Sequence, residues 1–229
     1  PLHAIVSFSA YGIAEVKEAE PDTLKQYFCN IEKGANRLVG LVNEVLDVAK
    51  LEKGEQSFMM EECDLLYIIE QCKTSLTALA KQKGVTIELI NNTLECKAIL
   101  DSNRIMQLIT NILGNAIKFS PRDSEISITV DATTLNEAAS SKALKVSICD
   151  EGIGVPEEEL DTIFEAFVQS SRTDTGSGGT GLGLAISKRI VNAHQGRIKA
   201  DNNNDKGARF TFILPKELKA GEYQHVETE

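Results

Sequence analysis

A glycine-rich stretch in the last third of the chain has the composition of a phosphate-binding turn. Residues 176–184 read Gly-Ser-Gly-Gly-Thr-Gly-Leu-Gly-Leu, with five glycines in nine positions. Glycine loses the most backbone freedom on folding, so such a run is expected where the backbone must bend sharply or approach a ligand. A helical pattern follows Leu182, and the free N–H groups of a helix N-terminus favour an anion such as phosphate. Taken alone, the stretch leaves a flexible linker as the alternative.

Three polar residues share one stripe of an expected helix upstream. Asn111, Asn115 and Lys118 lie at i, i+4 and i+7, beside an apolar stripe of the same helix. Asparagine is a poor residue for a helix interior, because its side chain competes for backbone hydrogen bonds. Amide oxygens can ligate a hard cation such as Mg²⁺, and an ammonium can pair with phosphate oxygens. The alternative is an ordinary solvated polar face.

A carboxylate follows an expected buried strand. Asp150 comes directly after the alternating apolar residues of that strand and precedes Glu-Gly-Ile-Gly. At the rim of an apolar sheet face it could accept a hydrogen bond from the amino group of a flat ligand such as adenine. The alternative is an Asp-Glu-Gly turn without a ligand.

Two phenylalanines precede the glycine-rich stretch and predict the anchor of a lid. Phe164 and Phe167 flank Glu-Ala, and the following residues, 169–178, are rich in Ser, Thr and Gly. A segment without apolar anchors is expected to be mobile. Between an aromatic pair and a glycine-rich turn, we interpret it as a lid over a ligand, with residues 169–180 ordered only when nucleotide is bound.

Four motifs in this order resemble the N, G1, F and G2 boxes of sensor histidine kinases. They are Asn-Ile-Leu-Gly-Asn-Ala-Ile-Lys-Phe at 111–119, Asp-Glu-Gly-Ile-Gly at 150–154, Phe-Glu-Ala-Phe at 164–167 and Gly-Gly-Thr-Gly-Leu-Gly-Leu at 178–184. The resemblance is dense over residues 101–215 and looser over residues 1–54. A dinucleotide-binding interpretation of the glycines fails, because no βαβ unit surrounds them.

The resemblance implies an α+β protein with two domains. Residues 1–54 would form a helical hairpin that dimerises into a four-helix bundle, and residues 55–216 an ATP-binding α/β sandwich of the Bergerat type, followed by a polar tail at 217–229. It implies a cytoplasmic kinase that binds Mg-ATP and transfers the γ-phosphate to a histidine, for relay to an aspartate of a response-regulator receiver domain. The implied partners are a second copy, bound through residues 1–54, and that receiver domain. Neither nucleic acid nor membrane contact is expected for this segment.

The resemblance also assigns roles to individual residues. Asn115 should ligate Mg²⁺ with Asn111 beside it, Lys118 should contact phosphate, and Asp150 should bind the adenine amine. Thr211 should help to hold adenine through water. The full set implied to bind ATP is Asn111, Asn115, Lys118, Asp150, Gly152, Gly154, Phe164, Phe167, Arg172, Gly179, Thr180, Gly181, Leu182, Gly183, Leu184 and Thr211.

Two observations bear on the competing functions. ATP-hydrolysing relatives of this fold place a glutamate, which activates water, at the position of Asn111. Asparagine cannot act as a base, so a protein side chain is favoured over water as the acceptor of the phosphoryl group. Residues 1–5 resemble the end of the phosphoacceptor motif, so the acceptor histidine is expected upstream of Pro1, and His3 lies about two helical turns too late. A binding-only regulatory module and a serine-directed kinase of the anti-sigma type stay open as alternatives.

The periodicity of the remaining residues predicts the elements that position these groups. Residues 31–49 carry a heptad seam of Ile31, Ala35, Leu38, Val42, Val45 and Ala49, which favours helical neighbours. We expect two helices in the first 54 residues, which end near Pro21 and near Gly54. Further helices are expected from Asp64 to Gly84, from 101 to 119 and over 156–168. A last helix should follow the glycine stretch and end at a cap at Gly196. Strands are expected at 57–63, 85–89, 96–100, 126–130, 144–148, 197–203 and 208–214.

Composition sets the outer bounds. The chain has 229 residues, of which 42% are apolar and 25% charged, typical of a globular protein. The net charge of −10 argues against nucleic acid as the main partner. Five cysteines without a C-x-x-C pair indicate reduced thiols, with Cys72 and Cys149 expected in the core.

Overall fold

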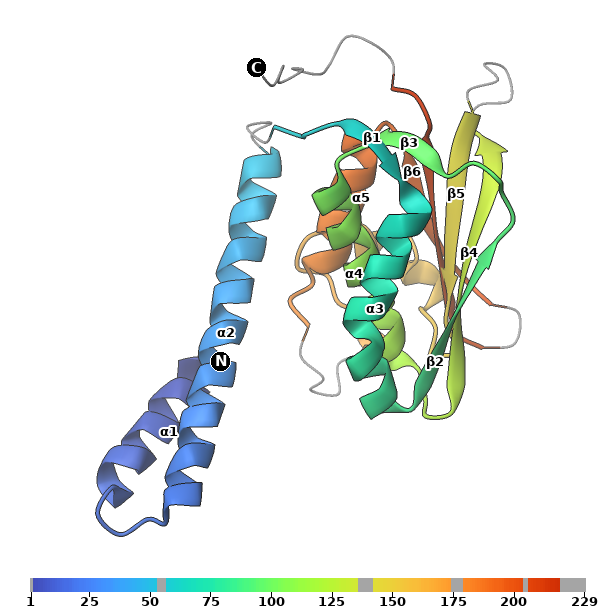
Figure 1. The fold of residues 1–229 in the computed structure, drawn as a ribbon. Coiled ribbons are helices and arrows are strands. Elements are labelled where there is room, and N and C mark those ends of the chain that lie inside the picture. The colour runs from blue at the N-terminus through green and yellow to red at the C-terminus, as the bar shows by residue number, and fades with distance from the viewer. Residues whose placement is uncertain (1, 53–56, 136–141, 174–178, 204–205, 219–229) are drawn as a thin grey trace. The chain divides into compact units, whose positions relative to one another are not determined.

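The structure is a computed structural model that describes residues 2–52, 57–135, 142–173, 179–203 and 206–218. The chain divides into two compact units, residues 1–53 and 54–229 (Figure 1). None of the helices in these described ranges is long and apolar enough to cross a membrane.

The first unit consists of two helices that pack against each other. Helix α1 spans Leu2–Glu15 and α2 spans Pro21–Glu52. The rings of Phe8, Tyr11 and Tyr27 form a cluster with centroids 5.9–6.4 Å apart, which holds the two helices together near the turn. No residue of α1 is buried, and large apolar side chains stay exposed on both helices: Leu2, Val6, Ile13, Phe28, Val39, Val42, Val45 and Leu46.

The second unit contains a five-stranded sheet and a two-stranded ribbon. The sheet has the order β2-β4-β5-β7-β6, with β2 at Val85–Asn91, β4 at Ser124–Thr134, β5 at Lys142–Cys149, β7 at Ala208–Pro215 and β6 at Arg197–Asn202. Only β2 and β4 are parallel, because a helix connects them, and the other pairs are antiparallel. The ribbon pairs β1 (Glu61–Asp64) with β3 (Lys97–Leu100).

Three helices cover one face of the sheet (Figure 1). They are α3 at Leu65–Lys83, α4 at Ser102–Phe119 and α5 at Gly183–Ala193. The predicted ends of α3 are confirmed. Asp64 Oδ1 accepts hydrogen bonds from the N–H groups of Leu66 and Tyr67, and Gly84 closes the helix with φ of 74°.

The core lies between these helices and the sheet. On β5, Leu144, Val146 and Ile148 are at most 1% exposed, which matches the alternation expected of a strand with one buried face. Cys72 of α3 is buried, as predicted. The same prediction was wrong for Cys149, which is half-buried on the opposite face of the sheet, where Arg209 Nε donates a hydrogen bond to its Sγ at 3.2 Å.

Two predicted helix features also differ in the structure. The segment 156–168 forms two separate 3₁₀ turns, Glu157–Glu159 and Thr162–Phe164, in place of one helix. A continuous helix is excluded because Glu165 is extended and Phe167 has φ of 67°, which a right-handed helix cannot include. After α5, Gly196 N donates a closing hydrogen bond to the Val191 carbonyl at 2.8 Å, as a cap does, but the left-handed residue is Gln195, with φ of 55°.

Candidate functional site

Helix α4 brings the predicted polar stripe to the glycine-rich stretch. Its apolar stripe, which includes Ile105, Ile109, Ile112 and Ala116, is buried against the fold. The neighbouring stripe therefore faces the start of α5. Asn111 Nδ2 donates a hydrogen bond to the carbonyl oxygen of Gly183 at 3.2 Å.

Lys118 lies against the same stretch. A Cβ atom on Gly179 would be 3.8 Å from Lys118 Nζ, so the ammonium group is next to the glycine backbone. The ammonium also lies 4.7 Å from the centroid of the Phe119 ring, within the range of a cation–π contact. Asn115 sits between Asn111 and Lys118 on this stripe and is partly exposed.

The glycine-rich stretch turns tightly before α5. Gly181 has φ of 71°, and a Cβ atom there would be 2.7 Å from the carbonyl carbon of Phe167. The Gly181 carbonyl accepts a hydrogen bond from Phe167 N at 2.9 Å, and Thr180 Oγ1 accepts one from Leu182 N at 3.1 Å. Leu182 is buried, which fixes the turn to the core, and as the N-cap residue of α5 it makes no side-chain capping hydrogen bond within the described part of the chain. These groups, which begin at Gly183 and Leu184, are suited to an anion.

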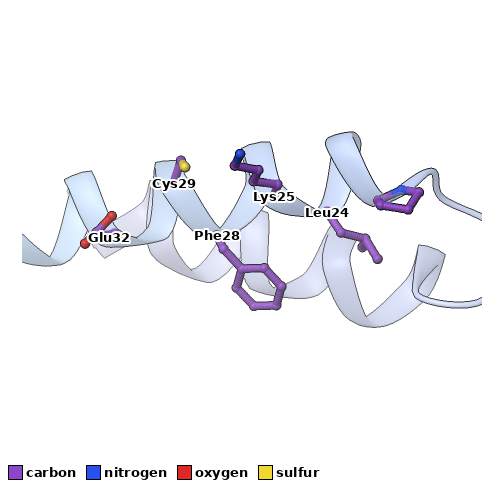
Figure 2. A pocket seen from close by; sticks show the side chains of 6 residues that line it. Leu24, Lys25, Phe28, Cys29 and Glu32 are labelled. Carbon is purple, nitrogen blue, oxygen red and sulfur yellow. The ribbon is translucent and has the colours of Figure 1, made fainter.

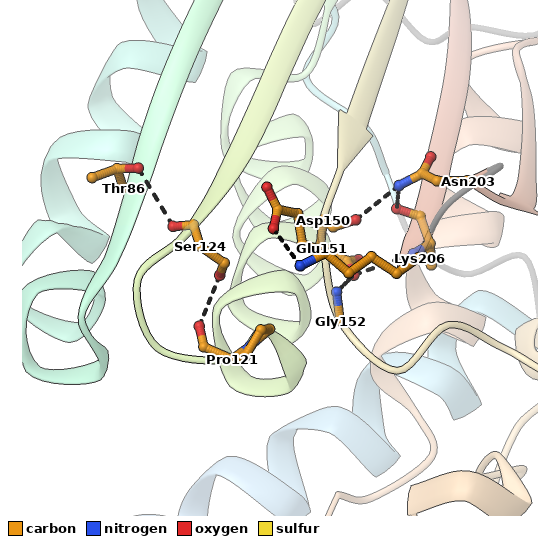
Figure 3. Close-up of polar contacts among 9 residues, drawn as sticks. Thr86, Pro121, Ser124, Asp150, Glu151, Gly152, Asn203 and Lys206 are labelled. Carbon is orange, nitrogen blue, oxygen red and sulfur yellow. Dashed lines mark hydrogen bonds and ion pairs between the residues drawn. The ribbon is translucent and has the colours of Figure 1, made fainter.

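Asp150 presents a carboxylate in a largely buried position. It is 6% exposed, and its Oδ1 accepts a hydrogen bond from Gly152 N at 2.7 Å (Figure 3). Oδ1 also accepts a hydrogen bond from Ala208 N at 3.2 Å. Burial raises the pKa of this carboxyl, and the two N–H donors partly oppose the rise. No group in the described ranges donates to Oδ2. That oxygen can accept a hydrogen bond from a ligand.

The two glycines after Asp150 are required by close contacts. A Cβ atom on Gly152 would lie 2.8 Å from Asp150 Oδ1 and 2.9 Å from the carbonyl oxygen of Phe119. Gly154 has φ of 66°, a backbone conformation that other residues rarely adopt. The loop can therefore pass close to the end of α4 only without a side chain at Gly152, and it can take its turn at Gly154 only with a left-handed backbone.

Of the two phenylalanines predicted to anchor the lid, one is buried and the other is exposed. Phe164 is buried and meets the ring of Phe210 edge to face, with centroids 6.3 Å apart, so it anchors this segment as predicted. Phe167, by contrast, is 67% exposed. Phe167 holds the segment through its backbone hydrogen bond with Gly181, and its ring is not an anchor.

The beginning of the predicted lid is attached to the loop after Asp150. Arg172 Nη1 donates a hydrogen bond to the carbonyl oxygen of Ile153 at 2.7 Å. Glu159 accepts hydrogen bonds from Ser171 N at 3.2 Å, and hydrogen bonds from Ser170 and Ser171 lower the pKa of its carboxyl. Mobility without nucleotide was predicted for residues 169–180, of which 174–178 lie outside the described ranges, and it stays a prediction.

Thr211 does not lie at this site. It alternates with Phe210 and Phe212, whose rings are buried, so its side chain is on the opposite face of the sheet. Its Oγ1 is 3.2 Å from Ser147 Oγ on β5. The residue of β7 that reaches Asp150 is Ala208, through its backbone N–H.

Sequence reasoning predicted a hairpin between β6 and β7 but not its contact with the loop that carries Asp150. Asn202 and Asn203 hydrogen-bond to the loop after Asp150, and Figure 3 shows Asn203 reaching that loop from the turn. The only sequence signal was a polar, glycine-containing turn, which marks a hairpin wherever it occurs.

The described part of the chain contains no group of three His, Cys, Asp or Glu side chains able to hold a metal ion. A hard cation here would be held by the amide oxygens of α4 together with ligand oxygens. This composition fits Mg²⁺, which commonly takes few protein ligands and completes its shell with phosphate and water.

Comparisons with known proteins agree with this arrangement. Residues 100–218 match the family described as histidine kinase-, DNA gyrase B-, and HSP90-like ATPase. The chain is 32% identical over 220 residues to the signal transduction histidine-protein kinase BarA of Escherichia coli strain K12, a match that covers 95% of this chain and 23% of BarA.

Solved structures give the same fold. The crystal structure of full-length ShkA in complex with AMPPNP has a TM-score of 0.73 at 26% identity, and covers 96% of this chain and 47% of that one. The histidine kinase ThkA in complex with the response regulator protein TrrA has a TM-score of 0.68 at 24% identity, and covers 93% of this chain and 57% of that one. The family match over residues 100–218 includes more than half of the 229 residues, and this protein therefore belongs to the family of histidine kinase-, DNA gyrase B- and HSP90-like ATPases.

Proposed function

We propose that this chain is the kinase core of a sensor histidine kinase, which binds Mg-ATP and directs the γ-phosphate to a histidine of the whole protein. The observation that carries the proposal is the placement of Asn111 and Lys118 against the glycine backbone at the start of α5. An amide and an ammonium are thereby brought next to the N–H groups at the start of α5, which together form a set of donors and ligands for polyphosphate.

The proposed ATP site has a base end and a phosphate end. Asp150 Oδ2 accepts a hydrogen bond from the exocyclic amine of adenine, while Gly152 and Gly154 let the backbone approach the ring. Lys118 and the N–H groups at the start of α5 bind phosphate oxygens. Asn115 ligates Mg²⁺, with Asn111 beside it. Bound Mg-ATP supplies the phosphoryl group and the cation that offsets its charge.

A protein acceptor is favoured over water by the residue at the head of the α4 stripe. Asn111 has no basic group, and its amide donates to Gly183, so it cannot take a proton from an attacking water molecule. The carboxyl of Asp150 accepts hydrogen bonds from Gly152 N and Ala208 N and belongs to the proposed base end. BarA is a histidine kinase, which supports the same choice, and this chain spans 23% of BarA.

We further propose that the first unit is a dimerisation and phosphotransfer module. Its exposed apolar residues continue along α2, where Val42 and Val45 are 50% and 45% exposed. Near the start of α2 a shallow pocket is lined mainly by apolar atoms. Phe28 is one of its lining residues, and Figure 2 shows its ring projecting from α2. A second copy would cover these side chains by completing a four-helix bundle.

A response-regulator receiver domain is the proposed acceptor of the phosphoryl group from that histidine. The neighbour ThkA is in complex with a response regulator protein, which supports this partner class. A cytoplasmic location, where ATP is available, is part of the same proposal.

The experiment compares this chain with the same chain extended at its N-terminus through the acceptor motif. Both are incubated with γ-labelled ATP and Mg²⁺, and the protein is then treated with acid or base. Label that survives base but not acid in the extended protein supports a phosphohistidine. Label stable to acid favours a serine-directed kinase, and free phosphate without labelled protein favours a hydrolase. Nucleotide binding with neither product favours a binding-only module.

A further inference from the structure

The turn between β6 and β7 is tied by side-chain amides to the loop that carries Asp150. Asn202 Oδ1 accepts a hydrogen bond from Val155 N at 2.9 Å, and Asn202 Nδ2 donates one to the Val155 carbonyl at 2.6 Å. Val155 is 8% exposed, so its backbone groups have little access to water and depend on these partners. The amide of Asn202 thus pairs with Val155 as a neighbouring strand would.

Asn203 fixes the other end of the loop. Its Nδ2 donates hydrogen bonds to the carbonyl oxygens of Asp150 at 2.8 Å and Ala208 at 3.4 Å (Figure 3). Its own N–H donates to the Gly207 carbonyl at 3.0 Å, which closes the turn. Ala208 N then reaches Asp150 Oδ1. Both the backbone and the carboxylate of Asp150 are therefore held from this one turn.

The loop and the turn are also in direct steric contact. A Cβ atom on Gly154 would lie 2.9 Å from Asn202 Oδ1, and one on Gly207 would collide with the carbonyl oxygen of Asp150. The loop has little freedom to shift toward the turn. Asp150 N donates to the Ala208 carbonyl at 2.9 Å, and Arg172 holds the carbonyl of Ile153. Asn202 and Asn203 add the side-chain hydrogen bonds that hold the loop at residues 155 and 150.

We propose that Asn202 and Asn203 are positioning residues that determine base specificity, by holding Asp150 Oδ2 where it meets the exocyclic amine of adenine. The inference rests on the proposed nucleotide site. Both asparagines act through Asp150 and Val155. A hydrogen bond to an ionised acceptor depends steeply on distance and angle. If the loop loses the hydrogen bonds of Asn202 or Asn203, the protein should therefore lose its preference for a base with an amine before it loses affinity for the phosphates.

The test measures the affinities of the whole chain for Mg-ATP and Mg-ITP by calorimetry. Inosine carries a carbonyl oxygen in place of the amine, so its binding does not depend on the amine–carboxylate hydrogen bond. We expect the wild type to prefer ATP by about tenfold or more, as a hydrogen bond to a charged group predicts. Asn202→Ala should reduce this preference by about tenfold, through weaker ATP binding, and leave ITP affinity within about twofold.

The matched control is Asn92→Ala. Asn92 Nδ2 donates a hydrogen bond to Asp131 Oδ1 at 2.9 Å on the exposed side of β4, so this variant loses an amide hydrogen bond that does not involve the loop. It should keep the wild-type preference for ATP. Asn203→Ala, which removes the bond to the Asp150 carbonyl, provides an independent measurement if Asn202→Ala does not fold.

The outcomes separate the inference from the function on which it rests. A wild type that binds ATP and ITP equally overturns the adenine site, and the inference with it. A wild type that prefers ATP, together with an unchanged preference in Asn202→Ala and Asn203→Ala, overturns the inference and leaves the site intact. An equal loss of affinity for both nucleotides also overturns it, because that result indicates general loosening of the fold.

Discussion

Replacing Asp150 by asparagine should weaken ATP binding and stabilise the fold at the same time. The substitution keeps the shape of the side chain and an oxygen that can accept from Gly152 N and Ala208 N. It removes the negative charge and places an NH₂ group where Oδ2 now has no donor. An NH₂ group cannot accept from the adenine amine.

The two effects have separate magnitudes. A hydrogen bond to a charged acceptor contributes about 1.5–3 kcal/mol, so ATP affinity should fall by about 10- to 150-fold. The effect on stability follows from the pKa. Burial raises the pKa of the Asp150 carboxyl above its ordinary value of 3.8, so the folded chain retains this proton to a higher pH than the unfolded chain does. Its contribution to stability is therefore lost as the pH rises from about 4 through the folded pKa.

Two measurements check this reasoning. Calorimetric titration with Mg-ATP gives the affinity, and denaturant unfolding at pH 4 and pH 7 gives the free energy of unfolding of both proteins. Asp150→Asn should gain stability relative to the wild type between pH 4 and pH 7 while binding ATP more weakly. Unchanged ATP affinity would refute the role of Asp150 at the base end. A relative loss of stability toward pH 7 would refute the account of its burial.

Three further substitutions test other parts of the structure. Gly181→Ala should lower the free energy of unfolding by about 1–3 kcal/mol, because φ is 71° and the new Cβ would lie 2.7 Å from Phe167, whereas Gly179→Ala, with 3.8 Å to its nearest neighbour, should cost less in the same denaturant titration. His194 is fully buried, and burial lowers the pKa of its imidazole, so its contribution to stability is present above about pH 6.5 and lost as the pH falls below it. Denaturant unfolding of His194→Gln should therefore show a smaller loss of unfolding free energy between pH 7 and pH 5 than the wild type, and an equal loss in the two proteins would contradict this account of His194. Asn115→Ala should reduce the gain in ATP affinity that Mg²⁺ provides by about tenfold in paired titrations with and without the metal, and an unchanged gain would exclude Asn115 as a ligand.

Local patterns predicted the elements and much of the site. The apolar spacing of α4 correctly predicted which face is buried, and this placed Asn111 and Lys118 on the neighbouring stripe. The ends of α3 were predicted because an N-cap aspartate and a left-handed glycine act within a few residues of the helix end.

The errors concern features that depend on contacts between distant segments. Thr211 was assigned to adenine, but a one-residue step along β7 moves a side chain to the other face of the sheet. Phe167 was expected to be an anchor, but its backbone conformation is set by pairing with Gly181. The role of Asn202 depends on Val155, 47 residues away, and no local pattern contains that information.

Hydrogen exchange of the whole chain with and without Mg-AMPPNP tests most directly whether this is a nucleotide site. The account predicts slower exchange on binding in residues 111–118, 150–155 and 179–184, and little change in the strands β2 and β6 beyond the site. Unchanged exchange in these three segments at saturating nucleotide, or slowing confined to other parts of the chain, would contradict it.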